Sequence, residues 1–173
     1  IQYKTSNLLE SEGEALVNTV NTIGVMGKGI ALQFKNQFPA NAKIYIKACK
    51  EKTFDIGQLL ITTEVSLLNG EKIIINFPTK TDWRKPSEYS YIENGLVELV
   101  KFIKEKEIKS IAIQPLGAGN GGLNWSKVKV LMEKYLSNID CNIFIYEPNA
   151  IVQEALKKER VKLTPARAML LSV

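Results

Sequence analysis

The sequence lacks histidine altogether and has only two cysteines, Cys49 and Cys141. Without histidine there is no Ser-His-Asp or Cys-His pair and no histidine-based metal site, so acid–base chemistry must come from Lys, Asp, Glu, Tyr, Cys or the substrate. Two isolated cysteines support neither a disulfide framework nor a zinc site. We therefore expect no metal and no cofactor.

Long apolar runs are also missing. No run approaches the length of a membrane span, and the N-terminus lacks the charged-then-apolar pattern of a signal peptide. We therefore expect a cytoplasmic protein with no membrane partner. At 173 residues the chain is most economically one domain with a proper core.

Charge leaves two interpretations open. The net charge is +5 and the pI is about 9.1, which suits contact with phosphates or nucleic acid. The lysines are scattered and often paired with Glu, which equally suits an ordinary solvated surface.

The chain is organised around residues 15–34, ALVNTVNTIGVMGKGIALQF. A short apolar run, typical of a buried strand, is followed by Asn18 and Asn21 and then by the glycines Gly24, Gly27 and Gly29. A helical pattern begins directly after them. Backbone N–H groups and the positive end of a helix dipole converge in such a turn, and glycine lets a phosphate approach closely.

A second strand–glycine–helix unit occupies residues 110–126, where SIAIQPL leads into GAGNGG. One glycine-rich turn is a weak signal, but two such units favour a ligand with two phosphates. If their strands are neighbours in one sheet, both turns open at the same edge, where open α/β folds bind ligands.

The remaining pattern alternates strands and helices, which predicts an α/β protein. We expect Pro78 to stop the strand that begins at 72, Asn69-Gly70 to form a hairpin turn, and Ser87 to cap the helix that follows. We expect Ile44, Tyr45 and Ala48 to share one face of a helix. Strands are predicted at 2–9, 15–17, 56–63, 65–68, 72–77, 110–116 and 142–146, and helices at 30–38, 40–50, 87–106, 126–136 and 150–159.

Neither glycine turn fits the common nucleotide motifs. A Walker A site needs Gly-Lys followed by Ser or Thr, but Lys28 is followed by Gly29. The glycine spacing of the first turn is G-x-x-G-x-G, and no suitable acidic residue follows about 20 residues on, so the dinucleotide-binding fingerprint is also absent. These departures argue against a kinase or a dehydrogenase.

The chain resembles the macrodomain family, which binds ADP-ribose, and within it the branch of the antitoxin DarG and the terminal ADP-ribose glycohydrolase. The segments that carry the resemblance are EALVNTVNTIGVMGKGIALQFKNQFP, INFPTKTDWRKPS and IAIQPLGAGNGGLNW. The resemblance implies a three-layer α/β/α sandwich around a mixed, mostly parallel sheet. It places a macrodomain at 1–155 and a tail at 156–173 that leads toward a further C-terminal, toxin-binding region.

The same resemblance implies a function: removal of ADP-ribose from thymidine bases of DNA, which reverses a DarT-type toxin. A base that carries ADP-ribose on its pairing edge cannot pair, so we expect the DNA to be single-stranded or locally opened. Lys80 matches the lysine implicated in catalysis, and Asn21 matches the asparagine near the distal ribose. The implied ligand-binding residues are Asn7, Leu8, Gly24, Val25, Met26, Gly27, Lys28, Gly29, Ile30, Thr79, Trp83, Leu116, Gly117, Ala118, Gly119, Asn120, Gly121 and Gly122.

Two positions depart from the family pattern. Macrodomains usually carry Gly-Asp at positions 6 and 7, where the Asp accepts a hydrogen bond from adenine, and here Asn7 offers an uncharged amide oxygen. The related protein glycohydrolase has an Asp in its second glycine loop, whereas this chain has Asn120.

Other functions and roles remain open. The alternatives to the DNA glycohydrolase are a non-catalytic reader of ADP-ribose and an enzyme that deacylates or dephosphorylates ADP-ribose derivatives. Lys80 is a nucleophile, a base or an electrostatic stabiliser. Trp83 is either a stacking surface for a base or a core residue.

Overall fold

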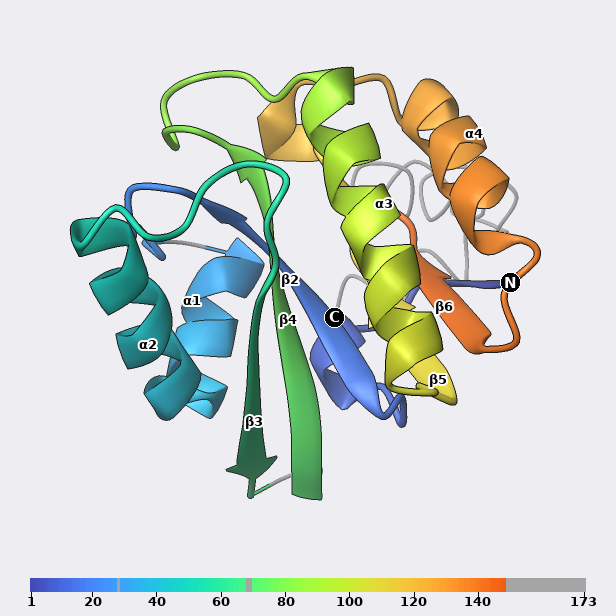
Figure 1. The fold of residues 1–173 in the computed structure, drawn as a ribbon, viewed down its shortest axis with the longest axis horizontal. Coiled ribbons are helices and arrows are strands. Elements are labelled where there is room, and N and C mark those ends of the chain that lie inside the picture. The colour runs from blue at the N-terminus through green and yellow to red at the C-terminus, as the bar shows by residue number, and fades with distance from the viewer. Residues whose placement is uncertain (28, 68–69, 149–173) are drawn as a thin grey trace, which may run out of the picture.

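The structure is a computed structural model that describes residues 1–27, 29–67 and 70–148. These residues form six strands in one sheet, four α-helices and two short 3₁₀ helices (Figure 1). The strands are β1 (Gln2–Lys4), β2 (Ala15–Asn21), β3 (Leu60–Ser66), β4 (Gly70–Lys80), β5 (Ser110–Ile113) and β6 (Asn142–Tyr146). The helices are η1 (Leu8–Glu10), α1 (Gly29–Gln37), α2 (Pro39–Lys50), α3 (Tyr89–Glu105), η2 (Gly119–Gly121) and α4 (Trp125–Leu136).

The sheet has the strand order β1-β6-β5-β2-β4-β3, in which all neighbours pair in parallel except β3 and β4. The inner strands are nearly continuous apolar runs because helices cover both of their faces. The helices α1 and α2 lie on one face of the sheet, and α3 and α4 lie on the other (Figure 1). The three-layer α/β/α sandwich with a mixed, mostly parallel sheet is therefore confirmed.

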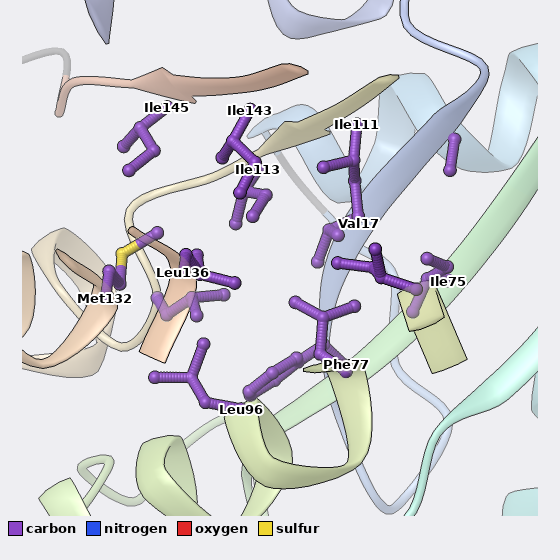
Figure 2. Packing of buried hydrophobic residues seen from close by; sticks show 14 of the residues in the cluster. Val17, Ile75, Phe77, Leu96, Ile111, Ile113, Met132, Leu136, Ile143 and Ile145 are labelled. Carbon is purple, nitrogen blue, oxygen red and sulfur yellow. The ribbon is translucent and has the colours of Figure 1, made fainter. Parts of the chain in front are cut away.

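The larger core lies between the sheet and the pair α3–α4 (Figure 2). Phe77 of β4 packs there against Gly95 of α3, where an added Cβ would lie 2.2 Å from the Phe77 ring. Glycine inside a helix costs about 1 kcal/mol relative to alanine, so the close approach of the ring explains it. Phe77 lies three residues before Lys80, the last residue of β4.

Several predicted boundaries are wrong. Pro78 does not stop β4, which continues to Lys80. β4 pairs with β3 only as far as Asn76, and beyond that residue it pairs with β2 alone. Pro78 has no N–H to donate, but on the side of β3 there is no pairing at this position that it could disrupt. The separate strands predicted at 56–63 and 65–68 are one strand, β3, which pairs with β4 without interruption from Leu60 to Ser66. The chain turns before this strand at Gly57, whose φ is +83°.

Two side-chain predictions and one further boundary also fail. Ile44 is exposed, because the buried stripe of α2 runs through Asn41, Tyr45 and Cys49, and a residue one position before Tyr45 points about 100° away from that stripe. Ser87 does not cap α3, since Glu88 occupies the cap position. The first strand ends at Lys4, and Leu8 and Leu9 belong to η1, where both are buried.

Two predicted features fall outside the described residues: the turn residue Asn69 and the tail from 149 onward, with its predicted helix. None of the described helices is long and apolar enough to cross a membrane.

Candidate functional site

The residues singled out in the sequence converge at one edge of the sheet. The strands β1, β6, β5, β2 and β4 run in parallel, so their carboxyl ends share that edge (Figure 1). The first glycine loop (residues 22–27 of the described chain) follows β2, and the second glycine loop (residues 114–122) follows β5. Since β2 lies between β5 and β4, the two loops and Lys80 come from three adjacent strands.

Asn21, the last residue of β2, organises the first glycine loop. Its side-chain oxygen Oδ1 accepts hydrogen bonds from the backbone N–H groups of Ile23 (3.1 Å), Gly24 (3.0 Å) and Val25 (3.3 Å). Its Nδ2 donates to the carbonyl of Val25 at 3.0 Å. The Asn21 amide therefore shapes the turn itself.

Tyr45 supports this arrangement from below. Its hydroxyl donates to the Asn21 backbone carbonyl (2.7 Å) and lies 2.9 Å from Asn21 Oδ1. The ring is fully buried, and desolvation raises the pKa of the phenol well above its ordinary value. Gly24, with φ +88°, packs against α2, where an added Cβ would lie 3.3 Å from Cys49 Cβ. The sequence predicted only that Tyr45 shares a helix face with Ile44 and Ala48, because the partner of its hydroxyl lies on another element.

The rest of the first loop is partly exposed. Val25 is 41% exposed and Met26 is buried beneath the loop. Gly27 is exposed, and Gly29 starts α1 with φ +62° and open space on its Cβ side. Ile30 is half-buried in α1. Lys28 lies outside the described residues.

Lys80 joins the two loops. It pairs with Asn21 in the parallel register of β2 and β4, and its Nζ donates to the carbonyl of Asn120 in the second loop at 2.7 Å. A weaker contact of 3.5 Å joins Nζ to the carbonyl of Trp83. The side chain is half-buried, and the preceding residue, Thr79, is buried. The backbone of Lys80 thus lies beside the start of the first loop, and its ammonium contacts the second loop.

The glycines of the second loop have two different structural roles. Gly117 is needed for packing, since an added Cβ would lie 2.7 Å from Leu123 Cδ1 and 2.8 Å from Ser87 Oγ. Gly119 and Gly122 also have positive φ, +69° and +80°, but nothing lies within 4 Å of their Cβ positions. Their backbone is open to the approach of a ligand. The neighbouring loop residues range from buried Leu116 and Gly121 through half-buried Ala118 to exposed Asn120.

Asn7 and Leu8 lie at the same edge, after β1. The Asn7 side-chain oxygen accepts from the Leu9 N–H at 3.1 Å and so caps η1, while its Nδ2 donates to Gln33 of α1 at 3.4 Å. Asn7 is exposed and Leu8 is buried. The amide oxygen retains a second lone pair, so it can still accept from a ligand.

The segment after Lys80 carries an exposed aromatic side chain beside a cation. Trp83 is 49% exposed, and the Arg84 guanidinium lies 5.7 Å from its ring centre. Arg84 also pairs with Asp82 at 2.7 Å, and these hydrogen bonds lower the pKa of the Asp82 carboxyl to about 2. Trp83 is therefore not a core residue, and its exposure leaves ring surface available for stacking.

Two surface hollows lie away from this edge. One, of about 280 Å³, is lined by Lys109 and residues 139–142, at the amino ends of β5 and β6. The other, of about 330 Å³, lies between α1 and α2. The paired loops and the lysine, rather than a hollow, identify the candidate site. In the described part of the chain no three His, Cys, Asp or Glu side chains gather in a way that could hold a metal ion.

Comparison with known proteins gives the same assignment of family. The Macro domain family matches residues 17–132. The DNA ADP-ribosyl glycohydrolase of Thermus aquaticus is 46% identical over the whole chain, and that of Mycobacterium tuberculosis is 44% identical over 99% of it. The chain spans about half the length of these curated relatives, 49% in each case.

Solved structures agree. The macrodomain of Mycobacterium tuberculosis DarG has a TM-score of 0.81 and 47% identity, with 85% of this chain and 97% of that one covered. Thermosipho africanus DarTG, solved in complex with ADP-ribose, has a TM-score of 0.78 and 36% identity, with 85% of this chain and 42% of that one covered. The chain belongs to the macrodomain family.

Proposed function

We propose that the chain binds ADP-ribose, with the diphosphate between the two glycine loops, and removes it from thymidine bases of DNA. The observation that carries the proposal is the position of Lys80, whose Nζ donates to Asn120 while its backbone pairs with Asn21. The names of the relatives support the reaction class, since those at 44–46% identity are DNA ADP-ribosyl glycohydrolases. The open backbone at Gly119 and Gly122 supports phosphate binding.

The bond to be broken joins C1 of the distal ribose to a ring nitrogen of thymine. Its transition state resembles an oxocarbenium ion, water supplies the hydroxyl that ends on C1, and its proton ends on the base. Thymine leaves as a delocalised imide anion, which reduces the need for strong protonation. Lys80 then acts as a nucleophile, as a base or as a charge that stabilises the departing base.

Asn21 serves the ribose by shaping the first loop. Its side-chain oxygen accepts hydrogen bonds from three backbone N–H groups and lies 2.9 Å from the Tyr45 hydroxyl. The hydrogen bonds of this oxygen are therefore made within the turn and its support. The loop that it fixes is the one that would pass beside the distal ribose. Asn7 fits the adenine end, since it lies at the other side of the same edge and keeps a free lone pair.

Single-stranded DNA is the proposed form of the substrate. A base that carries ADP-ribose on its pairing edge cannot pair, so it must be reached in an unpaired strand. Trp83 offers a ring on which a base stacks, and Arg84 and Lys85 offer charges for flanking phosphates. The electrostatic part of DNA binding should therefore weaken as salt rises.

We further propose a cognate DarT-type toxin as partner and the cytoplasm as the site of action. A relative from Thermosipho africanus, 38% identical over 83% of this chain, is a fusion of a DNA ADP-ribosyl transferase with a DNA ADP-ribosyl glycohydrolase. In this proposal residues 1–155 are the macrodomain, and residues 156–173 lead toward the toxin-binding region.

The test measures release of ADP-ribose from a modified thymidine oligonucleotide and from modified protein, side by side, for the wild type and Lys80→Ala. Loss of the Lys80–Asn120 hydrogen bond costs about 1 kcal/mol, which weakens ADP-ribose binding about fivefold. Loss of a catalytic group lowers kcat by about 100-fold or more. We therefore expect wild-type release from DNA alone, and a far larger loss in turnover than in affinity for Lys80→Ala.

Lys101→Ala is the matched control, because Lys101 lies on α3 with its ion pair to Glu98 exposed to solvent. It makes the same change of charge and should leave both quantities unaltered. Near wild-type turnover in Lys80→Ala would exclude a catalytic role for Lys80. Binding by the wild type without release from either substrate would show instead a reader of ADP-ribose.

A further inference from the structure

Ser87 makes an unusual pair of contacts beneath the second glycine loop. It lies between the Trp83 segment and α3, and the residue is 5% exposed. Its backbone N–H donates to the carbonyl of Gly121 at 2.9 Å. Its hydroxyl, in contrast, has no hydrogen-bond partner among the described residues. Since Glu88 occupies the cap position of α3, Ser87 is not needed to start that helix.

The hydroxyl faces the loop. A Cβ placed on Gly117 would lie 2.8 Å from Ser87 Oγ, and one placed on Gly121 would lie 3.2 Å from Ser87 Cβ. Gly117 and Gly121 thus both lie close to this one side chain. A buried hydroxyl that forms no hydrogen bond destabilises the state in which it stays unpaired. In the ligand-free structure the Ser87 hydroxyl therefore lies beneath the loop without a hydrogen bond to any described residue.

The loop above Ser87 is held through two consecutive carbonyls. Lys80 Nζ binds the carbonyl of Asn120, and the Ser87 N–H binds that of Gly121. In a trans peptide the N–H points opposite to the preceding carbonyl, so the Gly121 N–H is directed away from Lys80. Glycines adopt positive and negative φ with similar ease, which allows peptides of this loop to turn when a diphosphate arrives.

We propose that Ser87 is a positioning residue whose hydroxyl bonds to the backbone of the second glycine loop only when the diphosphate is bound. The inference rests on the proposed ADP-ribose binding. It connects occupation of the loop with the segment that carries Lys80 and Trp83, because Ser87 terminates that segment. The hydroxyl acts through the loop backbone, since it is buried beneath the loop rather than exposed to the ligand.

Ser87→Ala tests the proposal, because it removes the hydroxyl and keeps the backbone N–H that holds Gly121. Without ligand, the variant should be as stable as the wild type or more stable in urea unfolding, since an unpaired buried group is lost. Its affinity for ADP-ribose in calorimetry should fall about tenfold, as expected for a hydrogen bond made only in the bound state. Hydrogen exchange at residues 117–122 should show less protection by saturating ADP-ribose than in the wild type.

Ser11→Ala is the matched control. Ser11 is equally buried, but its hydroxyl already accepts from the Gly13 N–H at 3.1 Å, at the opposite edge of the sheet. This variant should lose stability and keep its affinity. Wild-type affinity and loop protection in Ser87→Ala would overturn the proposal, as would a loss of stability without ligand that accounts for the loss of affinity. Failure of the wild type to bind ADP-ribose would instead refute the proposed function on which it rests.

Discussion

Gly119→Val is the sharpest perturbation of the proposed phosphate site. Gly119 has φ +69° and open space around its Cβ position, so a valine side chain there projects into the region through which a diphosphate must approach the backbone. The left-handed conformation costs a non-glycine residue about 1–2 kcal/mol. That strain lowers stability, but it does not by itself prevent folding of a domain of ordinary stability.

Gly70→Val is the control that separates the cost of backbone strain from obstruction of the proposed phosphate site. Gly70 has φ +72°, also has nothing within 4 Å of its Cβ position, and starts β4 at the edge of the sheet opposite the loops. Both variants should therefore lose about 1–2 kcal/mol in urea unfolding. Only Gly119→Val should lose ADP-ribose affinity in calorimetry, by about 100-fold, which corresponds to about 2.7 kcal/mol. Equal affinity losses in the two variants, or wild-type affinity in Gly119→Val, would refute the placement of the diphosphate.

Two further predictions concern the supports of the site. Tyr45→Phe removes the hydroxyl that donates to Asn21, and it should weaken ADP-ribose binding up to about tenfold and speed hydrogen exchange at residues 23–25; unchanged exchange would mean that Asn21 holds the loop alone. Trp83→Ala should raise KM for a modified oligonucleotide, as expected from a stacking contribution of about 1–3 kcal/mol, and leave the affinity for free ADP-ribose unaltered. Equal losses for both ligands would show that Trp83 supports the pocket rather than the DNA.

The sequence predicted those parts of the site whose position follows from the local sequence pattern. Each glycine loop follows a buried strand and precedes a helix, so its place at a strand end is a local property of the chain. The adjacency of the two loops is not local. It follows from the strand order, which puts β2 between β5 and β4, and no periodicity in either segment encodes that order. The family resemblance, not the pattern, supplied it.

Residues that support the loops from a distance were missed for the same reason. Tyr45 stands on the buried stripe of α2, where its ring alone explains its position, and its hydroxyl finds Asn21 only after the helix docks. Ser87 looks like a helix cap because it precedes α3, but Glu88 occupies the cap position, and the Ser87 backbone N–H donates to the Gly121 carbonyl. In both cases the partner lies on an element distant in sequence, the end of β2 for Tyr45 and the second glycine loop for Ser87, so the hydrogen bond depends on tertiary packing rather than on sequence neighbours.

The engagement of Lys80 bears on how it would act. In the ligand-free structure Nζ donates to a carbonyl of the second loop, and this contact needs an N–H donor rather than a lone pair. A nucleophile must be a neutral amine whose lone pair faces C1; it keeps two N–H groups, but its hydrogen bond to the loop carbonyl is weaker than that of a charged ammonium. A lysine that acts through its charge keeps the contact and remains beside the departing base. The arrangement therefore favours the electrostatic role, because the charged ammonium makes the stronger hydrogen bond to the second loop while the glycosidic bond breaks.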